Sequence, residues 1–220
     1  MSEKCYYCDR DKVSDEHVPP KTLFDTKSQT NLNLFKVPSC EIHNNDKSDM
    51  DDCLFFMIKT TATHDNEDVL QKLCKKMQKN KKLQRCFDKD KQVMNFTDEI
   101  WKELATYFDM MACALYYKLK NHRINENHYC NVVLLSQVGN DDENSQYNQI
   151  FELNKKKLEH YTLQVDKWQQ KGREFKYSID NLQNNTIRVS MKFFDNVRVD
   201  AFYSKQEIST KFIFNSVEIF

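Results

Sequence analysis

Two short metal-binding patterns near the amino terminus constrain this chain more than any other feature. Cys5 and Cys8 form a C-x-x-C knuckle, and Cys40 and His43 repeat the same spacing. A tight turn lets both members of such a pair face one ion, so the four side chains predict a tetrahedral Cys3His zinc site that closes a loop of about 35 residues. The competing interpretation is that they are incidental in a chain with eight cysteines. The other five occupy apolar, periodic positions typical of buried thiols: Cys53, Cys74, Cys86, Cys113 and Cys130.

The composition of the segment that carries both knuckles favours zinc. Residues 1–47 are rich in Cys, Pro, Asn and charge and poor in periodic apolar residues, so a bound ion would supply folding free energy that a core does not. No stretch resembles a signal peptide, and no apolar run approaches the roughly 20 residues that span a bilayer. We therefore expect a soluble, cytoplasmic protein with reduced cysteines. The 33 Lys plus Arg balance 33 Asp plus Glu, so affinity for nucleic acid would need a local patch.

Three helices are expected in the middle of the chain. Ser48 resembles the N-cap of a nearly apolar helix over MDDCLFFMIKT, whose first turn carries carboxylates that suit the helix dipole: Asp49, Asp51 and Asp52. An amphipathic basic helix should begin at Glu67 and run through EDVLQKLCKKMQKNKKLQRCFDKDK. Thr97 fits the N-cap of a long helix over DEIWKELATYFDMMACALYYKLKNH, and Phe96 and Trp101 fit a hydrophobic staple.

After about residue 128 the pattern favours strands. The segments HYCNVVLLSQV, NTIRVSMKFFDNVRVDAFYS and KFIFNSVEIF are rich in Val, Ile, Phe and Tyr, and TIRVSMKF alternates like a half-buried strand. Between them, IFELNKKKLEHYTLQVDKWQQK is expected to form a strand and then a helix. The prediction is an α+β chain with three regions: a zinc-stapled domain over 1–62, a helical region over 63–125 that packs on it, and a β-rich region with at least one helix over 126–220.

The pair Glu16 and His17, in DEHVPP, has no role in a closed zinc site. Adjacent side chains of an extended strand point to opposite faces, so the two residues are expected to have separate functions. Glu16 could hold a hard divalent cation, and a neutral His17 imidazole could activate water as a general base. Asn44, directly after the second knuckle, offers a second oxygen ligand, although Asn45 could point inward instead. Outside this context, such an acid–histidine pair is usually an ordinary surface pair.

The order CYYC … EHVPPKTLF … NLFKVPSCEIHNNDKSDMDD resembles the HNH nuclease family, in its zinc-stabilised branch with a treble-clef, ββα-metal core. The resemblance covers about the first 55 residues, a quarter of the chain. It implies that His17 is the general base and that Glu16 and Asn44 bind a catalytic Mg²⁺ or Mn²⁺. It also implies that Asn33 pins the loop and orients the base, that Lys47 could neutralise a phosphate, and that the zinc is structural.

A member of that family would hydrolyse a phosphodiester bond in DNA. The base activates water, and the divalent metal stabilises charge on the phosphoryl oxygens and on the leaving 3′-oxygen. One departure concerns His43, because the second knuckle of the family usually ends in Cys. Imidazole is a good zinc ligand, but His43 could instead bind the catalytic metal. The resemblance alone suggests a phage-defence or mobile-element setting.

A basic run from residue 72 to residue 91 has nine Lys or Arg against two Asp. Four lysines on one predicted helix could contact phosphates, although such runs are usually solvated helix faces: Lys72, Lys75, Lys76 and Lys79. Two other functions stay open, a non-catalytic zinc-binding treble-clef module that binds nucleic acid or protein, and an RNA-cleaving enzyme on the same scaffold. The helical and β-rich regions could provide substrate grip, homodimerisation or regulation.

Overall fold

The computed structural model describes residues 2–24, 34–45, 48–62, 67–88, 93–94, 96–124, 128–136, 165, 167–171, 174–194, 197–205 and 217–218. Its helices are α2 (Glu41–Asn45), α3 (Ser48–Ala62), α4 (Glu67–Lys79), α5 (Lys81–Cys86) and α6 (Asp98–Lys120), with the 3-10 turns η1 (Lys21–Leu23) and η2 (Gln183–Asn185). Its strands are β1 (Ser14–Val18), β2 (Phe35–Ser39), β3 (Phe87–Asp88), β4 (Val93–Met94), β5 (Tyr129–Ser136), β6 (Gln169–Lys171), β7 (Phe175–Leu182), β8 (Thr186–Phe193), β9 (Val197–Ser204) and β10 (Val217–Glu218). The predicted mixture of helix and sheet is confirmed.

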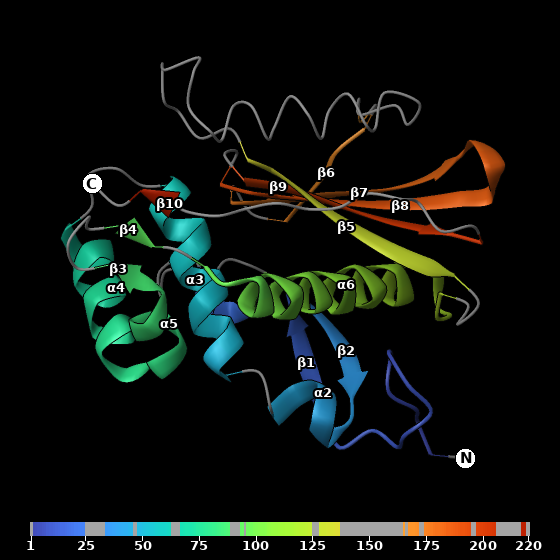
Figure 1. Cartoon of the computed structure of the whole chain (residues 1–220). Coiled ribbons are helices and arrows are strands. Elements are labelled where there is room, and N and C mark those ends of the chain that lie inside the picture. Colours follow the sequence, from blue (N-terminus) through green and yellow to red (C-terminus); the bar gives the residue numbers. More distant parts are fainter. Residues whose placement is uncertain are drawn as a thin grey trace.

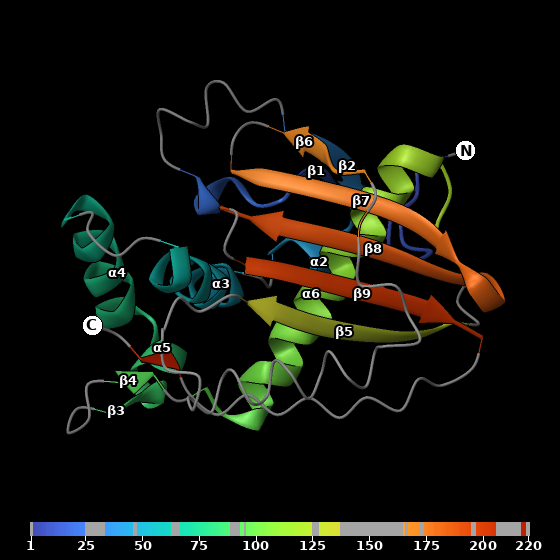
Figure 2. The same cartoon turned by 90° about the horizontal axis from the view of Figure 1, so that it is seen from above.

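The long helix α6 lies between two antiparallel β structures (Figure 1). A five-stranded sheet in the order β5-β9-β8-β7-β6 covers one side of the helix, and the β1–β2 hairpin lies on the other. Helix α3 separates the hairpin from α4 and α5, as both views show (Figures 1 and 2). One buried cluster includes side chains from all three predicted regions, so the boundaries at residues 62 and 125 stay a prediction.

The two predicted signals for the start of α6 are confirmed. The Thr97 hydroxyl accepts the Ile100 N–H at 3.4 Å, and Phe96 packs edge-on against Trp101 with ring centroids 5.3 Å apart. At the other end Asn121 adopts the left-handed conformation, with φ of 59°, and its N–H bonds a carbonyl of the last turn. Local sequence therefore fixes both ends of the helix that supports the rest of the fold.

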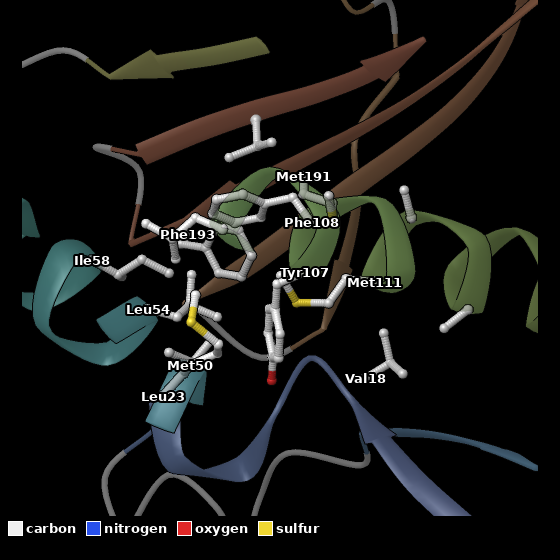
Figure 3. Packing of buried hydrophobic residues seen from close by; sticks show 14 of the residues in the cluster. Val18, Leu23, Met50, Leu54, Ile58, Tyr107, Phe108, Met111, Met191 and Phe193 are labelled. Atoms are coloured by element: carbon white, nitrogen blue, oxygen red, sulfur yellow. The ribbon is translucent and has the colours of Figure 1, made fainter. Parts of the chain in front are cut away.

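Buried side chains from α3, α6 and the sheet pack together where these elements meet (Figure 3). Leu54 and Ile58 of α3 pack toward Phe108 of α6 and Phe193 of β8, and all four side chains are buried. The expectation that α3 is buried is confirmed, because it has neighbours on several sides. The helix begins at Ser48, and the capping function predicted for this residue cannot be placed because its side chain lies outside the described residues.

The predicted basic helix from Glu67 is interrupted at Asn80. There the side-chain oxygen accepts hydrogen bonds from the N–H groups of Lys82 and Leu83, which caps a new helix, α5. The chain then turns into strand β3 rather than continuing as helix to residue 91. The apolar periodicity alone predicted a continuous helix, but the Asn80 side chain caps a second helix at this position and so ends the first.

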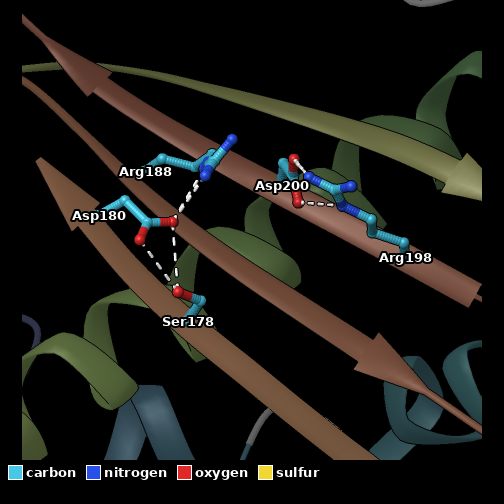
Figure 4. A network of polar contacts seen from close by, with 5 residues as sticks. All are labelled: Ser178, Asp180, Arg188, Arg198 and Asp200. Carbon is cyan, nitrogen blue, oxygen red and sulfur yellow. Dashed lines mark hydrogen bonds and ion pairs between the residues drawn. The ribbon is translucent and has the colours of Figure 1, made fainter. Parts of the chain in front are cut away.

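The β-rich region contains the predicted strands β5, β8 and β9, but the half-buried character expected for β8 is wrong. Arg188 and Ser190, which point away from α6, are almost as inaccessible as the apolar residues that point toward it. The Arg188 guanidinium bonds Asp180 at 2.7 Å, and in a second pair Arg198 bonds Asp200 at 2.5 Å (Figure 4). A buried charge is costly unless it is paired, and here each arginine has an aspartate partner, on the neighbouring strand for Arg188 and on the same strand for Arg198.

The prediction that five cysteines are buried thiols is partly wrong. Cys53 and Cys86 are buried and Cys113 is half-buried, whereas Cys74 and Cys130 are exposed. Cys74 lies on α4, whose contact face is narrow because the helix packs chiefly on α3 and α5, and Cys130 lies on the edge strand β5. Most of the segments predicted over 150–171 and 211–220 lies outside the described residues. The helix expected at the end of the first segment is wrong where it is described, because Gln169–Lys171 form strand β6 by pairing with β7. Within the described part, no helix is long and apolar enough to cross a membrane.

Candidate functional site

The four predicted zinc ligands come together beside the hairpin, with all ligand atoms within 4.8 Å of one another. Nδ1 of His43 lies 3.5, 3.4 and 3.2 Å from the sulfurs of Cys5, Cys8 and Cys40, and the sulfurs of Cys8 and Cys40 are 3.7 Å apart. Tetrahedral zinc, with bonds near 2.3 Å to sulfur and 2.0 Å to nitrogen, holds its ligand atoms about 3.5–3.8 Å apart. The cluster could therefore bind zinc.

Main-chain hydrogen bonds hold the first knuckle against the hairpin. The Cys5 N–H donates to the carbonyl of Arg10 at 2.9 Å, and the Tyr6 N–H donates to the carbonyl of Pro38, in β2, at 2.8 Å. The β1–β2 register, with Ser14 opposite Ser39, then brings the end of β2 and the second knuckle to the same place. The loop of 35 residues is thus closed by pairing as well as by its ligands.

The pKa values of the Cys8 and Cys40 thiols are shifted in opposite directions. Burial raises the pKa of the Cys8 thiol to about 11. Burial acts in the same direction on Cys40, but hydrogen bonds from backbone N–H groups at the start of α2, including that of His43, bring the pKa of Cys40 below its usual value. Between Cys8 and Cys40, the fold therefore favours the thiolate form at Cys40.

Tyr7, inside the first knuckle, fastens the cluster to the rest of the fold. Its ring packs edge-on against His43 with centroids 4.8 Å apart, and its hydroxyl donates to Asp109 of α6 at 2.7 Å. The other Asp109 oxygen accepts the hydroxyl of Tyr203, from β9, also at 2.7 Å. One carboxylate thus links the knuckle, the long helix and the five-stranded sheet.

A pocket of about 210 Å³ brings together Glu16, His17 and Asn44, which the sequence singled out. Both Glu16 and His17 line this pocket, and the separate functions expected for them stay a prediction. Strand β1 ends at Val18, and the turn that leads into η1 lines the pocket next to that end. The remaining lining comes from this turn and from two helices: Pro20, Lys21, Thr22, Asp51 and Tyr107.

Neighbouring side chains fix the two oxygen-bearing residues. Glu16 is 9% exposed and is hydrogen-bonded to the hydroxyl of Tyr6, whose pKa is raised first by burial and then by the Glu16 charge. The Asn44 amide nitrogen donates to the hydroxyl of Ser14 at 2.6 Å, which leaves its carbonyl oxygen as the group suited to a cation. His43 faces the sulfurs instead and does not line the pocket.

His17 is half-buried and lies in a positive environment. Its pKa is lowered first by burial and then by the charges of Lys21 and Lys36, while Asp15 acts weakly in the opposite direction. Both main causes disfavour the imidazolium. A neutral imidazole at the pocket is the form that can accept a proton from water.

Sequence reasoning missed the role of Asp51, which it assigned to the helix dipole. Asp51 lines the pocket and accepts a hydrogen bond from the hydroxyl of Tyr107, a buried α6 residue whose ring points toward the hairpin (Figure 3). Its neighbour Asp52 instead forms an ion pair with Lys76 of α4. The order of acidic residues in the sequence carries no signal that would separate these two functions.

Several predicted site residues are not brought to the pocket or cannot be placed there. Asn33 and Lys47 lie outside the described residues, as does the side chain of Asn45. The four candidate lysines belong to α4, and α3 lies between that helix and the hairpin (Figures 1 and 2). The ammonium group of Lys76 also pairs with Asp52 and lies 4.9 Å from the centre of the Phe55 ring.

Comparison of the chain with family models, with curated proteins and with solved structures yields no match. The family resemblance consequently stands on the first 55 residues alone.

Proposed function

We propose that this protein is a metal-dependent HNH-type endonuclease that hydrolyses phosphodiester bonds in DNA, with the treble-clef core that its first 55 residues resemble. One observation carries the proposal: the candidate base His17 and the oxygen donors Glu16 and Asn44 line a single pocket, immediately beside a cluster with the dimensions of a zinc site. Two knuckles alone would serve a binding module equally well. A half-buried imidazole with a lowered pKa, in a cavity that also holds carboxylates, is an arrangement suited to general-base hydrolysis.

The residues divide the reaction among them. His17 accepts a proton from the water that attacks phosphorus, and the bond from phosphorus to the 3′-oxygen breaks. Glu16 and Asn44 offer hard oxygen ligands of the kind Mg²⁺ and Mn²⁺ prefer, and Asp51 adds a second carboxylate to the same pocket. A bound divalent cation would stabilise charge on the phosphoryl and leaving oxygens. A zinc ion in the Cys3His cluster would have all four coordination positions filled by the protein, so its role in this scheme would be to stabilise the fold.

The test compares wild type with His17→Ala on plasmid and single-stranded DNA in Mg²⁺ or Mn²⁺. Removal of a general base should slow cleavage by about 10²–10⁴-fold. His122→Ala is the matched control, because His122 is exposed and lies at the far end of α6. Zinc content and melting temperature should be the same in all three proteins.

Two results would reject the assignment. Equal cleavage by wild type and His17→Ala excludes His17 as the base. Absence of cleavage by a zinc-loaded, folded wild type, on DNA and on RNA, would leave the non-catalytic zinc-binding module as the better description.

A further inference from the structure

The β1–β2 hairpin places a lysine directly opposite the candidate base. The antiparallel register pairs His17 with Lys36. Residues paired in this way project from the same face of the hairpin with Cβ atoms about 4.5–5.5 Å apart. Lys36 is exposed, so its ammonium group extends into solvent next to the imidazole.

A second lysine lies on the other side of the base. Lys21 begins η1 and lines the pocket itself. Lys21 and His17 therefore share one pocket lining, while Lys36 is paired with His17 across the hairpin. The nearby Asp15 carboxylate is engaged by Lys12 at 2.8 Å.

Several lysines of the described residues are held by acidic side chains. Lys4, Lys12, Lys76 and Lys82 each form an ion pair with an acidic side chain. In the described part of the chain, no such pair is found for Lys36. A lysine on a hairpin edge commonly serves to block edge-to-edge pairing, but that role does not require it to stand opposite a pocket histidine.

We propose that Lys21, His17 and Lys36 form a phosphate track, in which Lys21 contacts the phosphate that enters the pocket and Lys36 binds a neighbouring phosphate of the same strand. This inference rests on the proposed function, since it takes the nucleic-acid backbone as the ligand. The pocket interior carries the carboxylates of Glu16 and Asp51, which repel a polyanion. Cations at the rim offset that repulsion and give affinity that does not depend on base sequence.

The track replaces the basic helix as the phosphate-binding element. The lysines of α4 lie on the opposite side of α3 (Figures 1 and 2), so a strand in the pocket would have to cross that helix to reach them. Lys36 needs no such path, because it shares the hairpin with the base.

The experiment measures binding rather than cleavage. Fluorescence anisotropy of a labelled duplex and a labelled single strand is recorded over a salt series, without added divalent cation, for wild type and Lys36→Ala. Loss of one phosphate contact should weaken binding several-fold at low salt. It should also reduce the slope of log K against log salt by about 0.9 for duplex or 0.7 for single strand.

Lys120→Ala is the matched control. It removes the same charge from an exposed position on α6, about 20 Å along the helix from Tyr107, and should leave affinity and slope unchanged. Lys36→Glu should weaken binding more than Lys36→Ala, and unchanged melting temperatures should show that all variants fold.

The outcomes separate the track from the proposed reaction. Equal affinity and slope for Lys36→Ala and wild type overturn the track, whether or not His17→Ala abolishes cleavage. A loss of affinity confined to Lys36→Ala and Lys36→Glu supports the track even if no cleavage is found. Wild type that binds neither nucleic acid overturns it.

Discussion

Replacement of Asp109 with alanine tests how the zinc-binding segment is fixed to the rest of the fold. Each oxygen of this carboxylate accepts one tyrosine hydroxyl at 2.7 Å, from Tyr7 in the first knuckle and from Tyr203 in the sheet. The thiol of Cys113 adds a longer contact at 3.6 Å. The variant would remove the carboxylate acceptor from two hydroxyls that belong to different parts of the chain, and the Tyr203 hydroxyl would keep only its longer bond to the Asp109 main-chain carbonyl, at 3.3 Å.

The expected cost follows from these contacts. A hydrogen bond to a charged group stabilises a protein by about 1.5–3 kcal/mol, so two bonds represent about 3–6 kcal/mol. Part of this free energy is recovered because Asp109 is half-buried and the alanine that replaces it has no charge to desolvate. A further part is recovered because water can bond the hydroxyl of the half-buried Tyr7. The net loss should be about 2–4 kcal/mol, which lowers the melting temperature of a chain of this size by about 4–16 °C.

The assay is denaturant unfolding of the zinc-loaded protein, followed by circular dichroism. Tyr7→Phe removes one of the two bonds and should cost about half as much as Asp109→Ala. Thr106→Ala, at an exposed position three residues earlier on α6, should change little. If Asp109→Ala unfolds within about 0.5 kcal/mol of wild type, as ordinary surface substitutions do, the carboxylate does not hold the knuckle.

Three further outcomes are expected. Metal analysis should find about one zinc per chain, and Cys40→Ser should lower both zinc content and melting temperature, because the cluster supplies folding free energy; a normal melt without zinc would contradict the structural role. Asp51→Asn should raise the Mn²⁺ concentration for half-maximal binding, measured calorimetrically with zinc retained, whereas unchanged Mn²⁺ binding would exclude Asp51 from the cation site. Burial raises the pKa of Tyr107 and Tyr203 above the usual value of 10.0. Above about pH 10 the unfolded chain therefore binds fewer protons than the folded one, so stability should fall as pH rises. Ultraviolet titration should show tyrosines that ionise only on unfolding, and complete ionisation of the folded protein near pH 10 would refute their burial.

The sequence by itself determined the features that depend on local spacing. The knuckles indicated a metal cluster because two residues three apart can face one ion. Thr97, Phe96 and Trp101 marked the start of α6 because caps and staples act within a single turn. The alternating Val, Ile and Phe residues identified β5, β8 and β9. Each signal lies within a few residues of the structure it specifies.

Only the tertiary structure decided which distant residues share a site. Asp51 and Asp52 look equivalent in sequence, yet one lines the pocket and the other pairs with α4. Lys36 stands beside His17 because of strand register, which a shift of one residue would change. Asp109 accepts hydrogen bonds from two tyrosines, Tyr7 and Tyr203, that lie near opposite ends of the chain. These positions depend on how α6 packs between the hairpin and the sheet, and no short-range pattern records that packing.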